Sequence, residues 1–543
     1  MAAIALVTFM AYSGSFKGEF VSDDIRRVRD NPTIRSLDWS HVKEIFSTFD
    51  GSNYMPLKVL SLAIDYQLWG PAPAGFHLTN LLIHICCALI IYAFLMRLRM
   101  PPGTACLTAL LWAVHPMHVE SVAWISERKN VLSGLFFFAA FHVYLGFSEH
   151  RRTGNYLAVL ALYVLAVLSK MNTMVLPAIC LAYEATFRFR LRARDVVASL
   201  PFFGIAAAAA WYNLAGNPIH GTSWHGSGPV VTWLSSSVVF FRYLRNLVLP
   251  TDLQAWYEVP LRDSLCEPAV LLAVVGLVTI AATAIWLVYT RREGGFWIVW
   301  FGITLLPMIN VVVPFRSLMQ DRYMYLPMIG PLALGATYLS AVARSRAART
   351  GALVGAGALI VAWAALTYRQ VQIWASPLAL WKNGATRHAF IPGDIPHKTE
   401  DYEAKLAYLG DVVSEKPSAV TYNNMGALYF GAGRIAEALP VLEKAAELDP
   451  DDPNIMLNLG RAYLHSGRVV TAEGLLKRAV ALLPYSVVAR MNLARVHLAL
   501  GNAEAAQKEL DECERLEPAS RWLWKRERIY LKQLQDAQRQ REG

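Results

Sequence analysis

Apolar runs separated by short basic loops occupy the first two thirds of this 543-residue chain, up to about Tyr368. A helix of about 20 apolar residues crosses a bilayer, because it satisfies its own backbone hydrogen bonds inside the hydrocarbon. The chain is 55% hydrophobic and its mean hydropathy is +0.32, which is too apolar for a soluble protein of this length. The sequence therefore predicts an all-α fold, with a polytopic membrane domain followed by a soluble helical domain.

Eleven of these runs are predicted to span the membrane. The first run is interpreted as a transmembrane helix and not as a cleaved signal peptide, because no basic segment precedes it and no small-residue cleavage site follows it. A further run, residues 230–249, is interpreted as re-entrant or interfacial, because Arg242 and Arg245 are costly in hydrocarbon. The predicted spans are residues 1–16, 76–96, 104–119, 130–147, 156–169, 173–187, 196–214, 268–289, 296–313, 326–341 and 351–368.

Much of the net charge of +10 lies in the short loops between the runs. Arginine-rich loops mark the cytoplasmic side of membrane proteins, so this charge orients the helices and does not indicate a nucleic-acid partner. With the first loop outside, the basic loops at residues 97–99, 150–152 and 188–194 all fall inside. The same count places the C-terminal domain outside, on the side of the loop that follows the first span.

A 34-residue repeat marks the C-terminal domain. Glycine is suited to the turn between paired helices, proline ends the second helix, and small residues let the helices approach closely. The pattern resembles the tetratricopeptide repeat, whose superhelix offers a concave surface to peptides. The series that keep the 34-residue step are Pro450, Pro484 and Pro518; Gly433, Gly467 and Gly501; Asn424, Asn458 and Asn492; Ala438, Ala472 and Ala506; and Leu448, Leu482 and Leu516.

The repeats and the change of composition after Tyr368 define the predicted domains. Residues 1–370 form the membrane domain, and 371–417 form a linker or partial helical repeat. Residues 418–520 form three tetratricopeptide repeats, and 521–543 form a C-terminal cap helix and tail.

Two adjacent carboxylates, Asp23 and Asp24, follow the first span. Solvated loop acids are one interpretation. The other is a general base, or an anchor for a cationic or hydroxyl-bearing substrate, at the membrane surface. The next segment, residues 38–50, predicts a helix capped by Ser36 or Asp38 that lies in the membrane interface. Its apolar face consists of Trp39, Val42, Phe46 and Phe49.

Five motifs in the predicted outer loops occur in a fixed order. They are Phe20-Val21-Ser22-Asp23-Asp24, Asn53-Tyr54-Met55-Pro56-Leu57, Gly75-Phe76-His77-Leu78-Thr79-Asn80 with His84, His115-Pro116-Met117-His118-Val119-Glu120-Ser121, and Asp321-Arg322-Tyr323-Met324-Tyr325-Leu326-Pro327. Over nearly the whole chain, this ordered set resembles the transmembrane and tetratricopeptide-repeat containing O-mannosyltransferase-like proteins.

The resemblance implies a GT-C-fold glycosyltransferase. Such an enzyme takes a monosaccharide, mannose by the family's name, from a polyprenyl-phosphate donor and transfers it to Ser or Thr hydroxyls of proteins outside the cytosol. The expected partners are this lipid-linked donor, membrane lipid and an acceptor polypeptide on the concave face of the repeats. The small number of repeats resembles the bacterial members, which implies a bacterial inner membrane with the active site and the repeats in the periplasm.

The candidate catalytic residues are carboxylates at the predicted outer surface. Asp23 or Asp24 is expected to accept the proton of the acceptor hydroxyl as it attacks the anomeric carbon; which of the two serves as the base stays open. Glu120 is the third candidate, with a solvated loop acid as its alternative interpretation. A single displacement with inversion needs no nucleophile on the protein.

Arg322 is the first candidate for the donor phosphate, because a guanidinium stays charged and binds phosphate in a bidentate manner. Its alternative role is an interfacial anchor beside Tyr323 and Tyr325. The other candidates for donor or substrate binding are Lys58, Arg128, Tyr54, His77, His115 and His118. Lys129, Arg242 and Arg245 are weaker candidates, and Asn130, Lys170 and Asn172 are also read as ordinary helix termini.

Two positions depart from the family pattern. Met55 stands where the family usually has arginine before Pro56, so a phosphate contact is either missing or moved to Lys58. Asp321 stands where glutamate is commoner. Neither change affects the expected fold, but both weaken the transfer of the family's donor-site residues to this chain.

A metal site is a weaker hypothesis. The spacing His115-x-x-His118-x-Glu120 suggests ligands, and divalent cations assist some lipid-linked transferases, but Pro116 predicts a bend that separates the two rings. No metal ligand or cofactor is assigned, and a divalent cation is kept as an alternative. His77, Asn80 and His84 share a helix face, where hydrogen bonding between helices explains them as well. The six cysteines form neither a disulfide framework nor a zinc pattern.

Two other functions fit the sequence. An enzyme of the same chemistry could glycosylate a lipid or glycan, with the repeats recruiting partners. A membrane scaffold could use the repeats for envelope assembly or export, with a dispensable acid pair. Transport is disfavoured, because the charged residues lie at the ends of the spans and not at their centres.

Overall fold

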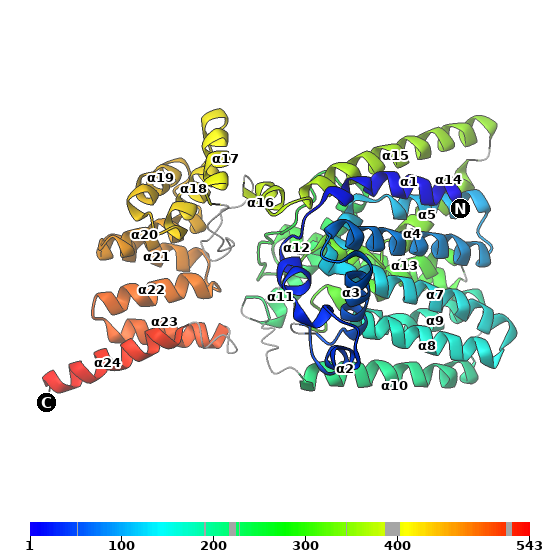
Figure 1. Ribbon diagram of the computed structural model, residues 1–543, viewed down its shortest axis with the longest axis horizontal. Helices are drawn as coiled ribbons and strands as arrows, with labels where there is room; N and C mark the ends of the chain where they lie inside the picture. The colour runs from blue at the N-terminus through cyan, green and yellow to red at the C-terminus, as the bar shows by residue number, and fades with distance from the viewer. Residues whose placement is uncertain are drawn as a thin grey trace. The chain divides into compact units, whose positions relative to one another are not determined.

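The computed structural model describes residues 1–50, 53–188, 192–216, 224–226, 228–290, 292–315, 317–343, 345–385, 402–516 and 524–542. These residues form helices and turns, and no strand longer than an isolated bridge occurs among them. They divide into two compact units, one made of residues up to 216 with 233–380 and the other of 224–232 with residues from 381 onward. We call them the membrane unit and the repeat unit. The all-α prediction is confirmed (Figure 1).

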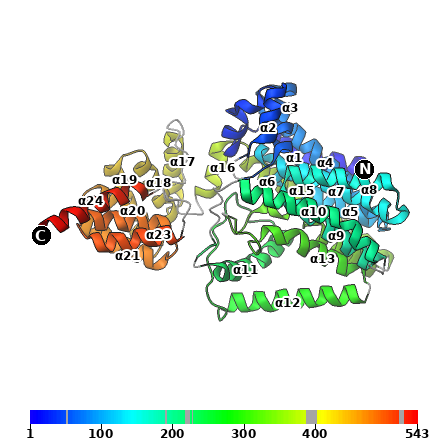
Figure 2. The same ribbon diagram turned by 90° about the horizontal axis from the view of Figure 1, so that it is seen from below.

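The membrane unit is a bundle of helices lying side by side (Figures 1 and 2). Neighbours in the bundle include α4 with α7, α7 with α8, and α13 with α14. Its main helices are α1 (Ala2–Tyr12), α3 (Pro56–Trp69), α4 (Pro73–Arg97), α5 (Pro102–Ala113), α7 (Arg128–His150), α8 (Thr153–Ser169), α9 (Leu176–Phe187), α10 (Ala193–Gly216), α11 (Pro229–Val248), α12 (Pro268–Tyr289), α13 (Glu293–Leu305), α14 (Ile329–Val342) and α15 (Arg346–Ile373).

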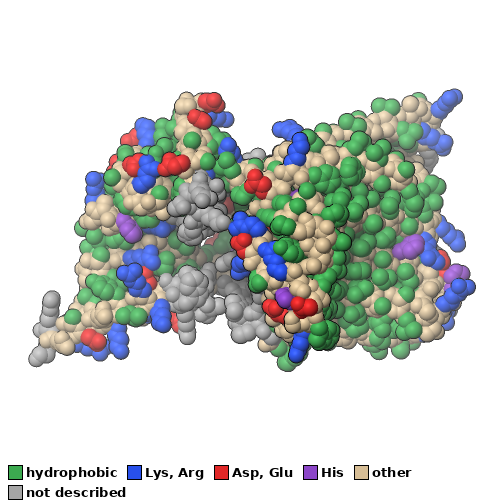
Figure 3. Space-filling model, in the orientation of Figure 1, with side chains coloured by type: hydrophobic (Ala, Val, Ile, Leu, Met, Phe, Trp, Pro, Cys, Tyr) green, Lys and Arg blue, Asp and Glu red, His purple; other side chains and the backbone are tan. Residues whose placement is uncertain are grey.

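Five helical segments among the described residues are long and apolar enough to cross a membrane. Much of their apolar surface faces outward: only 17% of the most apolar part of α12 is buried in the protein. The broad face of the membrane unit is covered by hydrophobic side chains (Figure 3). Exposed apolar surface of this extent needs a lipid environment, so the chain is an integral membrane protein. The five segments are Pro73–Arg97, Ile125–His150, Ala193–Ala215, Pro268–Tyr289 and Arg346–Ile373.

All eleven predicted spans overlap helices, but some boundaries were wrong. Five further predicted spans coincide with shorter apolar helices, and residues 173–187 coincide with α9. The predicted span 104–119 ends already at Ala113, because Pro116 starts a separate 3-10 turn, Pro116–His118. Helix α3 was not predicted at all. Helix α11, predicted to be interfacial, is not one of the five long apolar segments in the described chain.

The two ends of the bundle differ in composition. Helix α7 has Arg128 at one end and His150 at the other. Near His150, the basic loops form ion pairs, with Arg97 2.9 Å from Glu149 and Arg151 2.5 Å from Asp195. The end near Arg128 gathers the loops that carry the sequence motifs. We call these the basic end and the motif end.

Two buried indoles fix the backbone beside the last motif. The Trp112 side chain donates to the carbonyl of Tyr325 at 3.0 Å, and that of Trp300 donates to the carbonyl of Leu326 at 3.0 Å. Trp300 also stacks on Phe94, with ring centroids 6.0 Å apart. This aromatic core holds the segment after Arg322 against α4, α5 and α13.

The repeat unit consists of paired helices in the predicted register. The turn glycines Gly433, Gly467 and Gly501 have φ of 76°, 82° and 74°, a conformation that glycine adopts without strain. The helices are α16 (Pro377–Ala385), α17 (Tyr402–Glu415), α18 (Ala419–Gly431), α19 (Ile435–Leu448), α20 (Pro453–His465), α21 (Val469–Leu482), α22 (Val487–Ala499), α23 (Ala503–Leu516) and α24 (Lys525–Glu542).

Candidate functional site

The acid pair lies in a loop whose two carboxylates have different surroundings. The side chain of Asp24 is fully buried. Its Oδ1 accepts the backbone N–H of Ser126 at 2.7 Å, and its Oδ2 accepts that of Val21 at 3.2 Å. Burial raises the pKa of Asp24 to about 7, against the lowering effect of these hydrogen bonds. Asp24 therefore joins the acidic loop to the segment before α7, and it presents no surface to a substrate.

Asp23 is the accessible member of the pair, with 43% of its side chain exposed. Its Oδ2 lies 3.0 Å from Nε of Arg27, one turn along the π-helix Ile25–Arg29. Nη1 of Arg27 lies 3.0 Å from Oδ1 of Asp50. Arg27 thus holds two carboxylates from different loops, and Asp23 remains open to solvent on one side.

Lys58 continues this chain of ion pairs. Its ammonium lies 2.5 Å from Oδ2 of Asp50, and its side chain has no exposed surface. Burial lowers the pKa of Lys58 to about 8. Burial would raise the pKa of Asp50, but the charges of Lys58 and Arg27 outweigh it and lower that pKa to about 2. Lys58 therefore contributes charge to the site from beneath its surface.

Glu120 and Arg322 form the second part of the site, between α5 and α7 and before α14. The backbone N–H of Arg322 donates to Oε2 of Glu120 at 2.8 Å, and its guanidinium is paired with Oε1. The guanidinium also lies 3.6 Å from Glu127 and over the rings of Trp124 and Tyr323. Burial raises the pKa of Glu120, and Arg322 opposes this shift.

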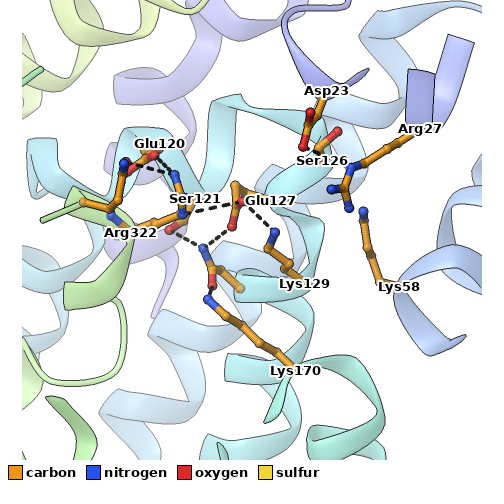
Figure 4. A network of polar contacts seen from close by, with 12 residues as sticks. Asp23, Arg27, Lys58, Glu120, Ser121, Ser126, Glu127, Lys129, Lys170 and Arg322 are labelled. Atoms are coloured by element: carbon orange, nitrogen blue, oxygen red, sulfur yellow. Dashed lines mark hydrogen bonds and ion pairs between the residues drawn. The ribbon is translucent and has the colours of Figure 1, made fainter. Parts of the chain in front are cut away.

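Glu127 links Arg322 to two lysines, as Figure 4 shows. Its Oε1 is 2.8 Å from the ammonium of Lys129, and its Oε2 accepts the side-chain amide of Asn130 at 2.8 Å. The ammonium of Lys170, just after α8, donates to the amide oxygen of Asn130. Within the described chain, no carboxylate lies at ion-pair distance from Lys170. Burial lowers the pKa of Lys170 to about 7.

The two parts belong to one site at the motif end. Burial would lower the pKa of Arg27, but Asp50, Asp23 and Glu127 together raise it, so Glu127 acts on both parts. The ten labelled residues lie around one region in Figure 4. Five cationic side chains and four carboxylates take part in these contacts. The cations are Arg27, Lys58, Lys129, Lys170 and Arg322, and the carboxylates are Asp23, Asp50, Glu120 and Glu127.

Other predicted residues lie around this site and not in it. Arg128 is fully buried, 2.5 Å from Asp65, and donates to the carbonyl of Phe76 at 3.0 Å. The hydroxyl of Tyr54 donates to the carbonyl of Phe46 at 2.8 Å. The buried ring of His77 packs beneath Gly18 of the acidic loop. These contacts favour positioning roles, and the sequence-based assignment of these residues to substrate binding stays a prediction.

The two histidines of the motif contact Leu247, Met117 and Tyr325. Nε2 of His115 lies 3.0 Å from the carbonyl of Leu247 in α11, and its Nδ1 accepts the backbone N–H of Met117. The ring of His118 packs edge-on against Tyr325. In the part of the chain that the structure describes, no three His, Cys, Asp or Glu side chains are grouped as metal ligands. Separately, Nε2 of His84 in α4 lies 2.9 Å from the carbonyl of Ala113 in α5, which is a hydrogen bond between helices, and its Nδ1 lies 2.9 Å from the Tyr325 hydroxyl.

Sequence reasoning missed Arg27, Asp50, Glu127 and the surroundings of Asp321. Arg27 stands four residues after Asp23, a spacing at which helical side chains meet. The carboxyl of Asp321 is buried and accepts the Tyr257 hydroxyl at 2.8 Å. Burial and the nearby Glu120 raise its pKa well above the ordinary value. Asp321 thus lies close to Glu120 and Arg322 with its carboxyl buried.

Comparison with known proteins identifies relatives of the chain. The tetratricopeptide-repeat family model matches residues 429–481 and 466–523. The chain is similar to the Protein O-mannosyl-transferase TMTC1 of Mus musculus, with 35% identity over 153 residues, which cover 26% of this chain and 16% of that protein. It is also similar to TMTC4 of the mouse, 30% identical over 175 residues, and to mouse TMTC3, 30% identical over 197 residues.

The matched segments cover only part of each protein. They span 28% of this chain and 23% of TMTC4, and 33% of this chain and 21% of TMTC3. The chain therefore covers less than a quarter of the length of these relatives. It is an integral membrane protein with tetratricopeptide repeats, and a homologue of the protein O-mannosyl-transferases TMTC1, TMTC3 and TMTC4.

Proposed function

We propose that the chain is a protein O-glycosyltransferase of the GT-C type. It takes a monosaccharide, mannose by the names of its relatives, from a polyprenyl-phosphate donor and transfers it to Ser or Thr hydroxyls. The observation that carries the proposal is the cluster at the motif end, where Arg322, Lys129 and Lys170 gather around Glu127 and Asn130 and the same site has an exposed carboxylate, Asp23. A polyprenyl-phosphate sugar is a phosphodiester and carries one negative charge.

The donor phosphate binds at Arg322, Lys129 and Lys170. Arg322 and Lys129 already share Glu127, with the Lys129 ammonium 2.8 Å from its carboxylate, so their charges lie close together. Lys170 contacts an amide oxygen instead of a carboxylate, and an anion therefore gains most from its charge. These residues lie at the ends of apolar helices, where a lipid-linked phosphate lies when its prenyl chain stays in the bilayer.

Asp23 is the general base. It accepts the proton of the acceptor hydroxyl while the hydroxyl oxygen attacks the anomeric carbon and the bond from that carbon to the phosphate oxygen breaks. The polyprenyl phosphate leaves with the bonding electrons, and the configuration at the anomeric carbon inverts. Arg27 orients Asp23 through their ion pair. Glu120 is a positioning residue, since it holds the backbone and guanidinium of Arg322.

The acceptor polypeptide is delivered from the repeat unit. The segment that leads toward the repeats begins beside the acidic loop, because the backbone N–H of Glu19 donates to the carbonyl of Ala375 at 2.8 Å. The basic loops lie at the other end of the bundle, which supports an extracytoplasmic site. A bacterial inner membrane with a periplasmic site and periplasmic repeats is the arrangement that we propose.

Transfer in vitro tests the proposal. The purified protein in lipid nanodiscs is incubated with polyprenyl-phosphate mannose, glucose or N-acetylglucosamine and with Ser/Thr peptides, and products are identified by mass spectrometry. We expect transfer from one donor and a loss of at least 100-fold in Asp23→Asn. Asp30→Asn is the matched control, because Asp30 is an exposed carboxylate that forms an ion pair with its neighbour Arg29. Transfer that survives Asp23→Asn would contradict the assignment of the base.

Two outcomes would contradict the proposed acceptor or the proposed enzymatic activity. Transfer to glycolipid but to no peptide would make the acceptor a lipid or glycan. A folded, reconstituted protein that transfers no sugar from any donor to any acceptor would favour a scaffold that acts through its repeats.

A further inference from the structure

The loop that carries Asp50 is tied to the end of α10. The backbone N–H of Tyr54 donates to Oδ1 of Asn213 at 2.9 Å, and the hydroxyl of Tyr54 donates to the carbonyl of Phe46 at 2.8 Å. Asn213 is buried, and its amide nitrogen donates to the carbonyl of Ala209 at 3.0 Å, one turn earlier in α10. This second hydrogen bond fixes the orientation of the amide, so its oxygen stays directed at the loop.

Aromatic contacts hold the same loop on both sides of Asp50. The ring of Phe49 is stacked on that of Tyr212 in α10, with centroids 5.6 Å apart and ring planes at 12°. The ring of Tyr54 meets Tyr212 edge-on, with centroids 4.7 Å apart. Stacked and edge-on contacts are the favoured arrangements of aromatic pairs. Tyr212 therefore contacts the residue before Asp50 and a residue that follows it in the same loop.

These contacts come from one side of the last turns of α10. Only 17% of the most apolar part of this helix is buried in the protein. Trp211 and Leu214, which flank the pair Tyr212 and Asn213 in the sequence, are 73% and 60% exposed. A helix that offers most of its surface to lipid thus directs a buried amide and an aromatic ring at the Asp50 loop. This arrangement favours a defined positioning role over general packing.

Asp50 transmits this constraint to the proposed base. Its Oδ1 lies 3.0 Å from Nη1 of Arg27, and its Oδ2 lies 2.5 Å from the ammonium of Lys58. Nε of Arg27 lies 3.0 Å from Oδ2 of Asp23. Two carboxylates from different loops therefore share one guanidinium. If the Asp50 loop moved away, Arg27 would lose one of its two anchors, and Asp23 would lose its fixed orientation.

We propose that Tyr212 and Asn213 are positioning residues for the transfer of sugar; the proposal rests on the function proposed above. They hold the Asp50 loop in place and, through Asp50 and Arg27, they orient the carboxylate of Asp23 toward the acceptor hydroxyl. A general base is effective only at hydrogen-bond distance from the proton that it accepts. Small displacements of the loop should therefore slow the reaction.

The proposed donor phosphate site is built from other contacts. Its cations are Arg322, Lys129 and Lys170, which are held by Glu120, Glu127 and Asn130. A displaced Asp50 loop should therefore lower kcat and leave the KM for the donor nearly unchanged.

Kinetics of the reconstituted full-length protein test this proposal. We expect Tyr212→Ala and Asn213→Ala each to lower kcat at least tenfold, with the KM for the donor within twofold of the wild type. Tyr212→Phe keeps both ring contacts and should retain at least half of the wild-type kcat. Trp211→Ala is the matched control, because Trp211 is the exposed neighbour in the same turn, and it should keep the wild-type kcat. A wild-type kcat in Tyr212→Ala would overturn the proposal, as would an equal loss in Tyr212→Phe.

A double-mutant cycle separates positioning from a loss of stability. Residues that act through one another show non-additive effects, whereas independent effects on kcat multiply. In the Asp50→Asn background, we therefore expect Tyr212→Ala to lower kcat by less than a further twofold. A full further tenfold loss in that background would show that Tyr212 does not act through Asp50 and would overturn the proposal.

Hydrogen exchange followed by mass spectrometry checks the loop without the reaction. The N–H of Tyr54 loses its acceptor in Asn213→Ala, so peptides that cover residues 49–56 should exchange faster than in the wild type, while peptides of α7 should not change. Unchanged exchange at 49–56 would overturn the proposal, and so would faster exchange that extends to α7, since it would indicate general unfolding.

The same measurements separate this inference from the proposed enzyme. A wild type that transfers no sugar from any donor would remove the proposed function and the positioning role together. A wild type that transfers sugar, with Tyr212→Ala and Asn213→Ala both at its kcat, would keep the enzyme and remove this inference alone.

Discussion

Asp23 and Asp24 are neighbours in sequence, yet the fold gives them different chemistry. Asp24 is buried under two backbone N–H donors, one of them from Ser126, about a hundred residues away. Asp23 is exposed and paired with Arg27. The sequence identified the pair, but it could not distinguish its members, because the partner of Asp24 comes from a distant segment.

Replacing Asp24 by asparagine tests this difference through stability. An amide offers one acceptor oxygen, so its NH2 group would face one of the two backbone N–H groups that the carboxylate now accepts. Leaving a buried donor unsatisfied costs about 1–3 kcal/mol. We therefore expect Asp24→Asn to lower the thermal stability of the purified protein, whereas Asp23→Asn leaves it unchanged. Differential scanning fluorimetry in detergent measures both, and equal melting temperatures for Asp24→Asn and wild type would contradict a stabilising role of the two hydrogen bonds to Asp24.

Lys170 predicts a pH dependence of donor binding. Burial lowers its pKa to about 7, so its positive charge is present below about pH 7 and is lost as the pH rises above it. If its ammonium binds the donor phosphate, the KM for the donor should rise about tenfold between pH 6.5 and 8.5. Lys170→Arg should abolish that rise, since a guanidinium stays charged, and Lys170→Met should give a high KM at every pH. A wild-type KM that does not change with pH would argue against this contact.

The helices were predicted more accurately than their ends. Each predicted span overlaps a helix, although only five segments of the described chain are long and apolar enough to cross a membrane, and the 34-residue step located the repeats. The sequence-based prediction was wrong at two places. Helix α3 was missed because its side chains Lys58 and Asp65 interrupt the apolar pattern, although both are buried in ion pairs. The histidine motif was assigned to the end of a span, but Pro116 separates it from α5.

The helix predicted over residues 38–50 is present but ends earlier, and its position in the membrane interface stays a prediction. Helix α2 (Trp39–Ser47) begins at the predicted cap Asp38, whose side chain accepts the backbone N–H of His41 at 3.0 Å. Ile45 is its buried residue, whereas Trp39 and Phe46 are exposed. The predicted apolar face thus points outward, as a helix that lies on lipid requires.

Two glycines of the repeats predict opposite effects of the same substitution. A Cβ at Gly460 in α20 would lie 2.8 Å from Leu476 of the paired helix, whereas a Cβ at Gly474 in α21 meets nothing within 4 Å. Gly460→Ala should therefore destabilise the repeat unit by about 1–3 kcal/mol through overpacking. Gly474→Ala should stabilise it by about 0.5–1 kcal/mol, because alanine favours the helix. Limited proteolysis of the full-length protein along a urea series reports both, and a stabilising Gly460→Ala would contradict the close approach.

At the scale of the molecule, the two ends of the bundle carry separate groups of ion pairs. The basic end forms ion pairs among loops that have no place in the proposed chemistry, such as Arg97 with Glu149. The motif end collects carboxylates and cations from five separate segments around Glu127 and Asp50. The order of the motifs in the sequence indicated which loops meet there. It could not indicate the ion pairs that join different loops, such as Arg27 with Asp50 and Arg322 with Glu120.

The division between the two ends predicts the sidedness of labelling. In a variant with its six cysteines replaced by alanine, single cysteines replace Lys43 of α2, His150 at the basic end or Lys444 of α19, all of them exposed. Because the acidic loop, α2 and the repeats are proposed to share the extracytoplasmic side, a membrane-impermeant maleimide should label positions 43 and 444 in spheroplasts and position 150 only in inverted vesicles. Labelling of 444 together with 150 would place the repeats in the cytosol and would exclude delivery of acceptors to Asp23 from the repeat surface.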